Sequence, residues 1–119
     1  INSERKRIAN YYINELKGID GLNFLQIPEY AEHNWHIFGF LVNPEDKYWI
    51  MDALRAEGIM CNVHYTPLHR NRIYKNLATD EDMQGAMEFY KRLLRLPIYP
   101  SLSEEERRKV VQAVKKVFR

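Results

Sequence analysis

The chain has 119 residues, 45% of them hydrophobic, and a net charge of only +2, because 18 basic residues nearly balance 16 acidic ones. This length and composition predict one globular domain and exclude a disordered chain. The weak net charge disfavours a nucleic-acid-binding protein. No run reaches the ~18 apolar residues of a membrane-spanning helix, and we expect no signal peptide. The single cysteine, Cys61, cannot form an intramolecular disulfide, which is typical of a reducing compartment.

The N-terminal part predicts a helix followed by two strands. Residues 3–17 place apolar side chains on one stripe at helical spacing, namely Ile8, Tyr12, Ile13 and Leu16. Gly18 follows, where glycine commonly ends a helix. Residues 22–27 favour a short strand. Residues 35–42, rich in aromatic and β-branched side chains, favour a longer strand in which Gly39 allows the close approach of a neighbour.

The middle of the chain predicts a helix, a buried strand and a long loop. Asn43 is placed to cap a helix that ends at Gly58. We expect the inward side chains of this helix to be Trp49, Ile50, Ala53 and Leu54. Residues 59–63 favour a buried strand. Residues 64–76 show no regular period, and a loop of this length in a small domain is more often functional than idle.

The C-terminal part predicts two helices with a short extended segment between them. Thr79 is placed to cap a helix that runs to about Leu94. Residues 96–99 favour a short extended segment; they include Pro97 and are followed by Pro100, which is typical of an edge strand or a strap. Ser103 and Glu106 form a capping-box pattern at the start of the last helix. We expect its basic residues to lie largely outside, namely Arg107, Arg108, Lys115 and Lys116.

Few strands combined with amphipathic helices predict the α+β class. We expect residues 1–119 to form a single domain in which helices cover one face of a small, mostly antiparallel sheet.

The segment His64 to His69 contains the residues best suited to bind a ligand. His64, Tyr65 and His69 follow an apolar run and surround Pro67. Imidazole and phenol groups can donate or accept hydrogen bonds, which suits an anionic or hydroxyl-rich ligand. The alternative is that His64 and Tyr65 merely close the end of the sheet, and the sequence alone leaves both open.

Other kinds of site are disfavoured. Two histidines without a third or fourth ligand disfavour a metal site. The sequence contains no nucleophile triad, no P-loop and no GxGxxG pattern. His33 and His36 flank Trp35, but residues three apart in a strand point to opposite faces. The basic and aromatic residues after His69 favour a solvated loop over a phosphate site, namely Arg70, Arg72, Tyr74 and Lys75.

Several motifs in this order resemble a known family. They are Trp35-His36-Ile37-Phe38, then Leu54-Arg55-Ala56-Glu57-Gly58-Ile59, then His64-Tyr65-Thr66-Pro67-Leu68-His69, and finally Leu96-Pro97-Ile98-Tyr99-Pro100-Ser101-Leu102-Ser103. The combination is similar to the C-terminal small domain of the DegT–DnrJ–StrS family of nucleotide-sugar aminotransferases, which use pyridoxal phosphate. The resemblance extends over nearly the whole chain.

The resemblance implies a fold type I aminotransferase, usually a cytoplasmic homodimer with active sites at the subunit interface. Such enzymes move an amino group, commonly from glutamate, onto a keto-sugar attached to a nucleoside diphosphate, as in cell-surface polysaccharide biosynthesis. The cofactor lysine belongs to a large domain that is absent here, and no lysine of this chain matches its context. We therefore assign no catalytic residue and no cofactor ligand, and expect the chain alone to fold without binding pyridoxal phosphate or catalysing.

The resemblance also implies which residues contact the substrate. His64, Tyr65 and His69 match the loop that faces the active-site cleft, and Trp35 and His36 match the strand that leads toward it. A chain that starts at Ile1 further indicates processing, trimming or an excised domain. We expect an exposed apolar surface where the large domain would pack, among Ile1, Tyr11, Leu68 and Ile73. The alternative is a stand-alone ligand-binding or regulatory module with the same fold and no catalysis.

Overall fold

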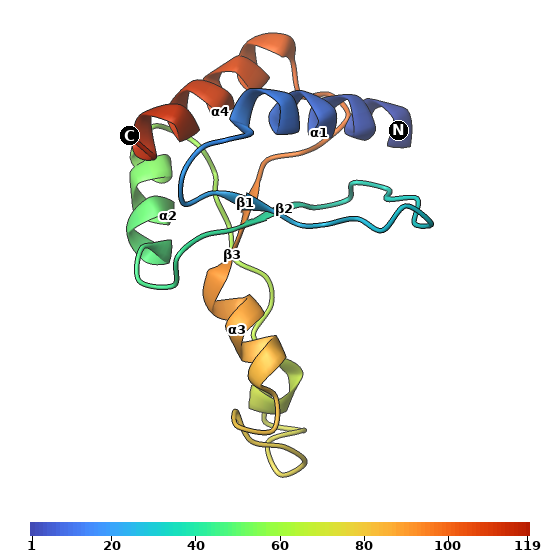
Figure 1. Ribbon diagram of the computed structural model, residues 1–119, viewed down its shortest axis with the longest axis vertical. Helices are drawn as coiled ribbons and strands as arrows, with labels where there is room; N and C mark the ends of the chain where they lie inside the picture. Colours follow the sequence, from blue (N-terminus) through green and yellow to red (C-terminus); the bar gives the residue numbers. More distant parts are fainter.

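The computed structural model describes residues 1–119 and shows four α-helices and a three-stranded antiparallel sheet with strand order β1-β2-β3 (Figure 1). The strands are β1 (Asn23–Phe24), β2 (Phe38–Leu41) and β3 (Leu93–Leu96). The helices are α1 (Asn2–Leu16), α2 (Lys47–Ala56), α3 (Gln84–Arg92) and α4 (Glu104–Val117), with a short 3-10 helix at Leu68–Arg70. The predicted α+β class with an antiparallel sheet is confirmed.

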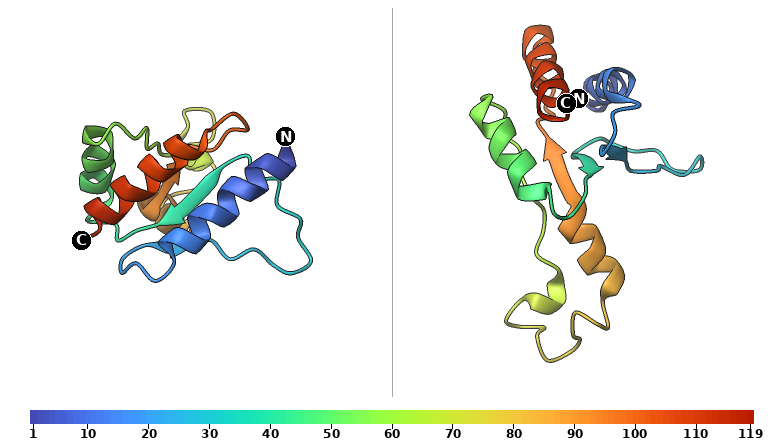
Figure 2. Two further views of the ribbon diagram at one scale, coloured as in Figure 1. Left: turned by 90° about the horizontal axis from the view of Figure 1, so that it is seen from above. Right: turned by 60° about the vertical axis from the view of Figure 1, so that its left-hand side comes forward.

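Three helices and the sheet enclose one core. Helices α1 and α2 both pack against α4, and all three gather at one end of the molecule, while α3 projects away from them (Figures 1 and 2). The predicted stripe of α1 is confirmed, since Ile8, Tyr12 and Leu16 have no exposed surface. The Tyr12 hydroxyl donates to the Pro97 carbonyl oxygen at 2.9 Å, which joins α1 to the segment after β3.

The N-terminal end of α4 is capped as the sequence predicts, but one of the basic residues of the helix, Arg107, is not exposed as predicted. Ser103 and Glu106 form the predicted capping box, with both reciprocal hydrogen bonds present. The prediction for Arg107 is wrong, since only 6% of this residue is exposed. Arg107 lies three and four residues before Val110 and Val111, and therefore on the inward stripe of α4. Its Nε donates to the Ser103 carbonyl oxygen at 3.3 Å.

The strands are shorter than the sequence predicts. The segment before Phe38 is not extended, because Trp35 has a positive φ of 53°. Residues 59–63 form no strand and contribute only an isolated bridge between Asn62 and Arg95. In the centre of the sheet Gly39 has Leu93 and Leu25 side chains against its Cα, where an added Cβ would lie 3.0 Å and 3.2 Å from them. The predicted close approach at Gly39 is thus confirmed.

Two helix boundaries also differ. Asn43 does not cap α2; its carbonyl oxygen accepts from the Asp46 N–H at 3.1 Å in a preceding turn, and Asp46 is the cap. Thr79 likewise bonds to Asp82 in a turn before α3, which begins only at Gln84. Of the expected inward side chains of α2, Ile50 and Leu54 are buried, Ala53 is half-buried and Trp49 is 62% exposed.

Lys47 takes an inward place at the start of α2, with only 1% of the residue exposed. Its ammonium donates to the Tyr90 carbonyl oxygen and lies 4.5 Å from the centroid of the Tyr90 ring. Burial lowers the Lys47 pKa. The contact ties α2 to the C-terminal end of α3, where carbonyl groups attract a positive charge. None of the helices is long and apolar enough to cross a membrane.

We predict that Cys61 makes the fold less stable at alkaline pH. Burial raises the pKa of its thiol from 9.0 to about 11, so the unfolded chain loses this proton first and unfolding becomes more favourable as pH rises from 9 to 11. Urea unfolding of the wild type should therefore lose on the order of 2 kcal/mol more than Cys61→Ala between pH 8 and 10.5. Equal pH slopes in the two proteins would contradict this prediction.

Candidate functional site

The segment from His64 to Arg92 forms an arm that extends away from the three-helix end of the molecule, as both Figure 1 and Figure 2 show. We call residues 64–92 the arm. Only Pro67, His69 and Met87 are buried within it. The arm holds three of the five residues that the sequence singles out, and it therefore presents most of them outside the core.

His64 and Tyr65 form the accessible part of the candidate site. Their rings are perpendicular neighbours, with centroids 4.1 Å apart and planes at 70°. Tyr65 is 76% exposed, so its hydroxyl is free to bind a ligand. The Nδ1 atom of His64 is buried and has no hydrogen-bond partner. A buried nitrogen without a hydrogen-bond partner costs free energy of folding. Together, His64 and Tyr65 place an imidazole and a phenol side by side on the arm.

His69 is placed differently. Only 6% of it is exposed, and its Nε2 lies 2.8 Å from Asp80 Oδ1. Asp80 also accepts from Arg70, whose Nε lies 3.0 Å from Oδ1. We call His69, Arg70 and Asp80 the Asp80 cluster. It joins the 3-10 helix to the turn before α3, so the His69 imidazole orders the arm, while its contact with a substrate stays a prediction.

The Asp80 carboxyl of this cluster stays ionised to low pH. Hydrogen bonds from Arg70 and then from His69 hold the pKa of the Asp80 carboxyl well below its usual value. A carboxyl whose folded-state pKa is lowered adds stability above the unfolded-state pKa, and loses it only as pH falls through the lower value. Nothing in the sequence pairs residues eleven apart, and sequence reasoning missed Asp80 for that reason.

Trp35 and His36 do not converge with the arm residues in this chain. β2 and residue 62 both pair antiparallel to β3, through Phe38 with Leu96 and through Asn62 with Arg95. The chain before Phe38 therefore passes the Leu96 end of β3, whereas the chain after Asn62 passes its Leu93 end. Figure 1 shows the two segments leaving the sheet in different directions. The two groups therefore lie toward opposite ends of β3.

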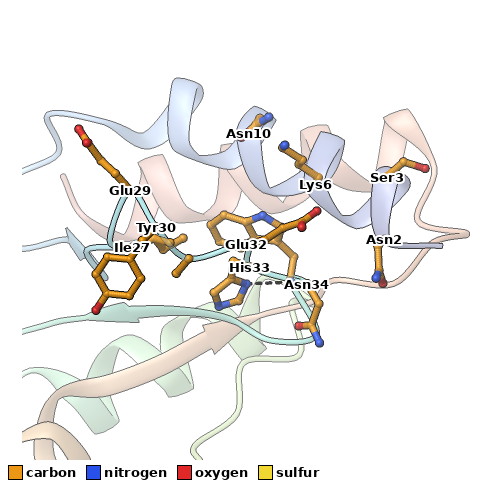
Figure 3. Close-up of a pocket in the computed structure, with 12 residues that line it drawn as sticks. Asn2, Ser3, Lys6, Asn10, Ile27, Glu29, Tyr30, Glu32, His33 and Asn34 are labelled. Atoms are coloured by element: carbon orange, nitrogen blue, oxygen red, sulfur yellow. Dashed lines mark hydrogen bonds between the residues drawn. The ribbon is translucent and has the colours of Figure 1, made fainter.

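Trp35 lines a groove of about 820 Å³ between α1 and the loop that precedes β2. In Figure 3, Lys6 and Asn10 stand on α1, and Glu32 and His33 stand on the opposing loop. A volume of this order is within the range of about 300–1,000 Å³ for ligand pockets. The groove is open, and its polar side chains outnumber its apolar ones.

The lysines of the chain differ in their surroundings. Lys47 is the only lysine that is not exposed, and its ammonium is engaged by the Tyr90 carbonyl oxygen and ring. No group of three or more His, Cys, Asp and Glu side chains is arranged to hold a metal ion.

Comparison with known proteins gives a consistent result. The model of the DegT/DnrJ/EryC1/StrS aminotransferase family matches residues 1–115. The UDP-N-acetyl-3-dehydro-alpha-D-glucosamine 3-aminotransferase of Acidithiobacillus ferrooxidans is 30% identical, over 98% of this chain and 31% of that protein. The spore coat polysaccharide biosynthesis protein SpsC of Bacillus subtilis is 29% identical, over 100% and 32%.

A solved structure supports the same relationship. The structure of S. venezuelae DesV, determined with a ketimine intermediate, superimposes with a TM-score of 0.88 at 28% identity. The alignment covers 98% of this chain and 32% of that one. The chain thus spans about a third of the length of the relatives it matches.

We predict that Asp80→Ala loosens the arm without unfolding the core. The variant loses the acceptor of both the His69 and the Arg70 hydrogen bonds. Amide hydrogen exchange across residues 64–83 should become several-fold faster, while exchange in α1 stays unchanged. Glu81→Ala is the matched control, since the neighbouring Glu81 carboxylate makes no ion pair. Equal exchange in the two variants would exclude an ordering role for Asp80.

Proposed function

The chain belongs to the DegT/DnrJ/EryC1/StrS aminotransferase family, and from this premise we propose that it is the C-terminal small domain of a pyridoxal-phosphate-dependent sugar aminotransferase. The complete protein transfers an amino group, with glutamate as donor, onto a keto-sugar linked to a nucleoside diphosphate. It works in the cytoplasm as a homodimer and serves the synthesis of a cell-surface polysaccharide. Pyridoxal phosphate accepts and returns the amino group when bound, and the part of the polypeptide outside this chain holds it.

The extent of the family match carries this proposal. It covers 115 of 119 residues, yet the chain spans only about a third of its relatives. The relative from Acidithiobacillus ferrooxidans is named for amination of a UDP-linked dehydro-sugar. A domain that matches such enzymes over nearly its whole length, and forms about a third of them, fits the part of the enzyme that covers the substrate.

The apolar surface of the arm supports the same conclusion. Its exposed large side chains include Leu68 at 69%, Leu77 at 78% and Ile73 at 83%. Exposed apolar side chains clustered on one segment mark a surface that packs against another body. Ile1 is also exposed, at 79%, whereas Tyr11 is half-buried against the core, so the expectation of an exposed Tyr11 is wrong. We propose that the arm packs on the remainder of the same polypeptide.

Within that assembly the residues of this chain bind and orient the substrate. Tyr65 presents a free hydroxyl, and His64 presents its imidazole beside it. Both groups suit the hydroxyls and phosphates of a nucleotide sugar, because each can donate or accept a hydrogen bond. His69 holds the arm in place through Asp80. Trp35 and His36 contact the substrate only if another surface brings it to their end of the sheet.

The complete protein tests the proposal directly. Purified with pyridoxal phosphate, it should convert a UDP-linked keto-sugar and glutamate into the amino sugar and 2-oxoglutarate, whereas the 119-residue chain should not. Turnover by the 119-residue chain alone would overturn the proposal that the cofactor is held by the part of the polypeptide outside this chain. A complete protein of this chain's own size, with no turnover and with direct ligand binding, would instead support the stand-alone binding module.

We predict that Tyr65→Phe weakens substrate binding in the complete protein. The substitution removes only the hydroxyl, and one hydrogen bond lost on both substrate and transition state costs about 1.4 kcal/mol. The KM for the nucleotide sugar should therefore rise roughly tenfold with little change in kcat. Tyr48→Phe is the matched control, because Tyr48 is a tyrosine 58% exposed on α2, outside the arm. An unchanged KM in Tyr65→Phe would remove Tyr65 from the substrate contacts.

A further inference from the structure

Trp35 has a backbone conformation that bulky residues rarely adopt. Its φ of 53° is the only positive value at a non-glycine residue of the chain. The left-handed conformation costs a residue with a Cβ about 1–2 kcal/mol. A fold keeps such a residue only where its surroundings hold it, and these positions cluster at functional sites. The contacts that hold Trp35 therefore show how its position is controlled.

Two side-chain-to-backbone hydrogen bonds hold this turn. The Nδ1 atom of His33 accepts from the Trp35 N–H at 2.8 Å, and the Oδ1 atom of Asn34 accepts from the His36 N–H at 3.0 Å. In each case a side chain accepts from the backbone two residues later, the pattern by which Asx-turns stabilise left-handed and turn conformations. In both hydrogen bonds the acceptor is an atom bonded to Cγ of the side chain. It is the imidazole nitrogen Nδ1 in His33 and the amide oxygen Oδ1 in Asn34.

Ring contacts complete the arrangement. The His33 and Trp35 rings lie 4.4 Å apart between centroids, and the Trp35 ring stacks on Phe38 at 5.9 Å with planes at 25°. Phe38 belongs to the core, with 1% exposed surface. The indole therefore joins the edge of the core to the wall of the groove shown in Figure 3.

Only one of the two hydrogen bonds can be broken by protonation of its acceptor, the bond to His33 Nδ1. An imidazole nitrogen accepts a hydrogen bond only while it carries no proton, whereas the amide oxygen of Asn34 accepts at any ordinary pH. Imidazole groups take up a proton at about pH 5–8. Protonated at Nδ1, His33 would direct an N–H at the N–H of Trp35 across 2.8 Å, and two donors at this distance repel.

We propose that His33 is the positioning residue of Trp35 and that it makes the shape of the groove depend on pH. Neutral His33 holds the indole against Phe38 in the groove wall, and protonated His33 releases it. The charged groups that line the groove together with His33 are Lys6 on α1 and Glu29 and Glu32 on its own loop. This pH-dependent switch does not depend on the proposed aminotransferase function, because all of the residues that form it lie within this chain.

The fluorescence of Trp35 reports the switch. The chain has two tryptophans, so Trp49→Phe leaves Trp35 as the only one, and Trp49 is exposed and outside the groove. The emission maximum of this variant should shift reversibly to longer wavelength as the pH falls from 8 to 5. Its titration curve should have the slope of a one-proton equilibrium. Far-UV circular dichroism should stay constant over the same range. A constant emission spectrum between pH 8 and pH 5 would overturn the proposal.

Two further substitutions in the Trp49→Phe background identify the responsible group. His33→Asn places an amide oxygen where Nδ1 lies and removes the titration, so its emission should match the parent at pH 8 and stay constant to pH 5. His36→Asn is the matched control and should keep the pH response, because His36 takes part only through its backbone N–H. Retention of the full response in His33→Asn, or its loss in His36→Asn, would assign the effect to another group and overturn the proposal.

Discussion

The antiparallel pairing of β2 with β3 is the interaction on which the rest of the structure depends. It joins four residue pairs, from Phe38 with Leu96 to Leu41 with Leu93. Beyond its last pair, Val42 and Arg92 exchange hydrogen bonds of 3.0 Å, one of them through the Arg92 side chain. Since β3 directly follows α3, this pairing fixes the arm at one end of the strand. At its other end it positions the segment that leads to α4 and closes the core.

The arm and the rest of the chain, which we call the body, are stabilised in different ways. The body buries a cluster of nineteen apolar side chains, contributed by three helices, the sheet and the segments that connect them, and such burial is the dominant favourable term in folding. The arm buries almost none, and holds its shape through a few polar contacts such as the Asp80 cluster and the Lys47 contact with α3. Polar contacts of this kind contribute little net stability. The arm is therefore the part of the chain that most needs a partner surface.

Local signals in the sequence predicted part of the local structure, although the caps expected at Asn43 and Thr79 are wrong, and pairings between distant residues were not predicted. The stripe of α1 and the capping box at residues 103–106 depend only on neighbours along the chain, and both are present. The two leucines that begin β3 fit a helical stripe equally well, and only pairing with β2 makes them a strand. His64 and Tyr65 stood out by chemistry alone. Asp80 did not, because its partner His69 lies eleven residues away and is set by the fold. The left-handed conformation of Trp35 was also missed, although the His33 and Asn34 side chains that hold its turn are close along the chain.

The proposed function requires that the arm packs on the remainder of the polypeptide and brings substrate-binding groups to it. Amide hydrogen exchange of the arm, measured in the complete protein and in the 119-residue chain, tests this claim most directly. We expect residues 64–83 to exchange at least tenfold more slowly in the complete protein, while the amides of α1 serve as the internal reference. Equal exchange of the arm in the two proteins would show that nothing packs on it, and would contradict the account.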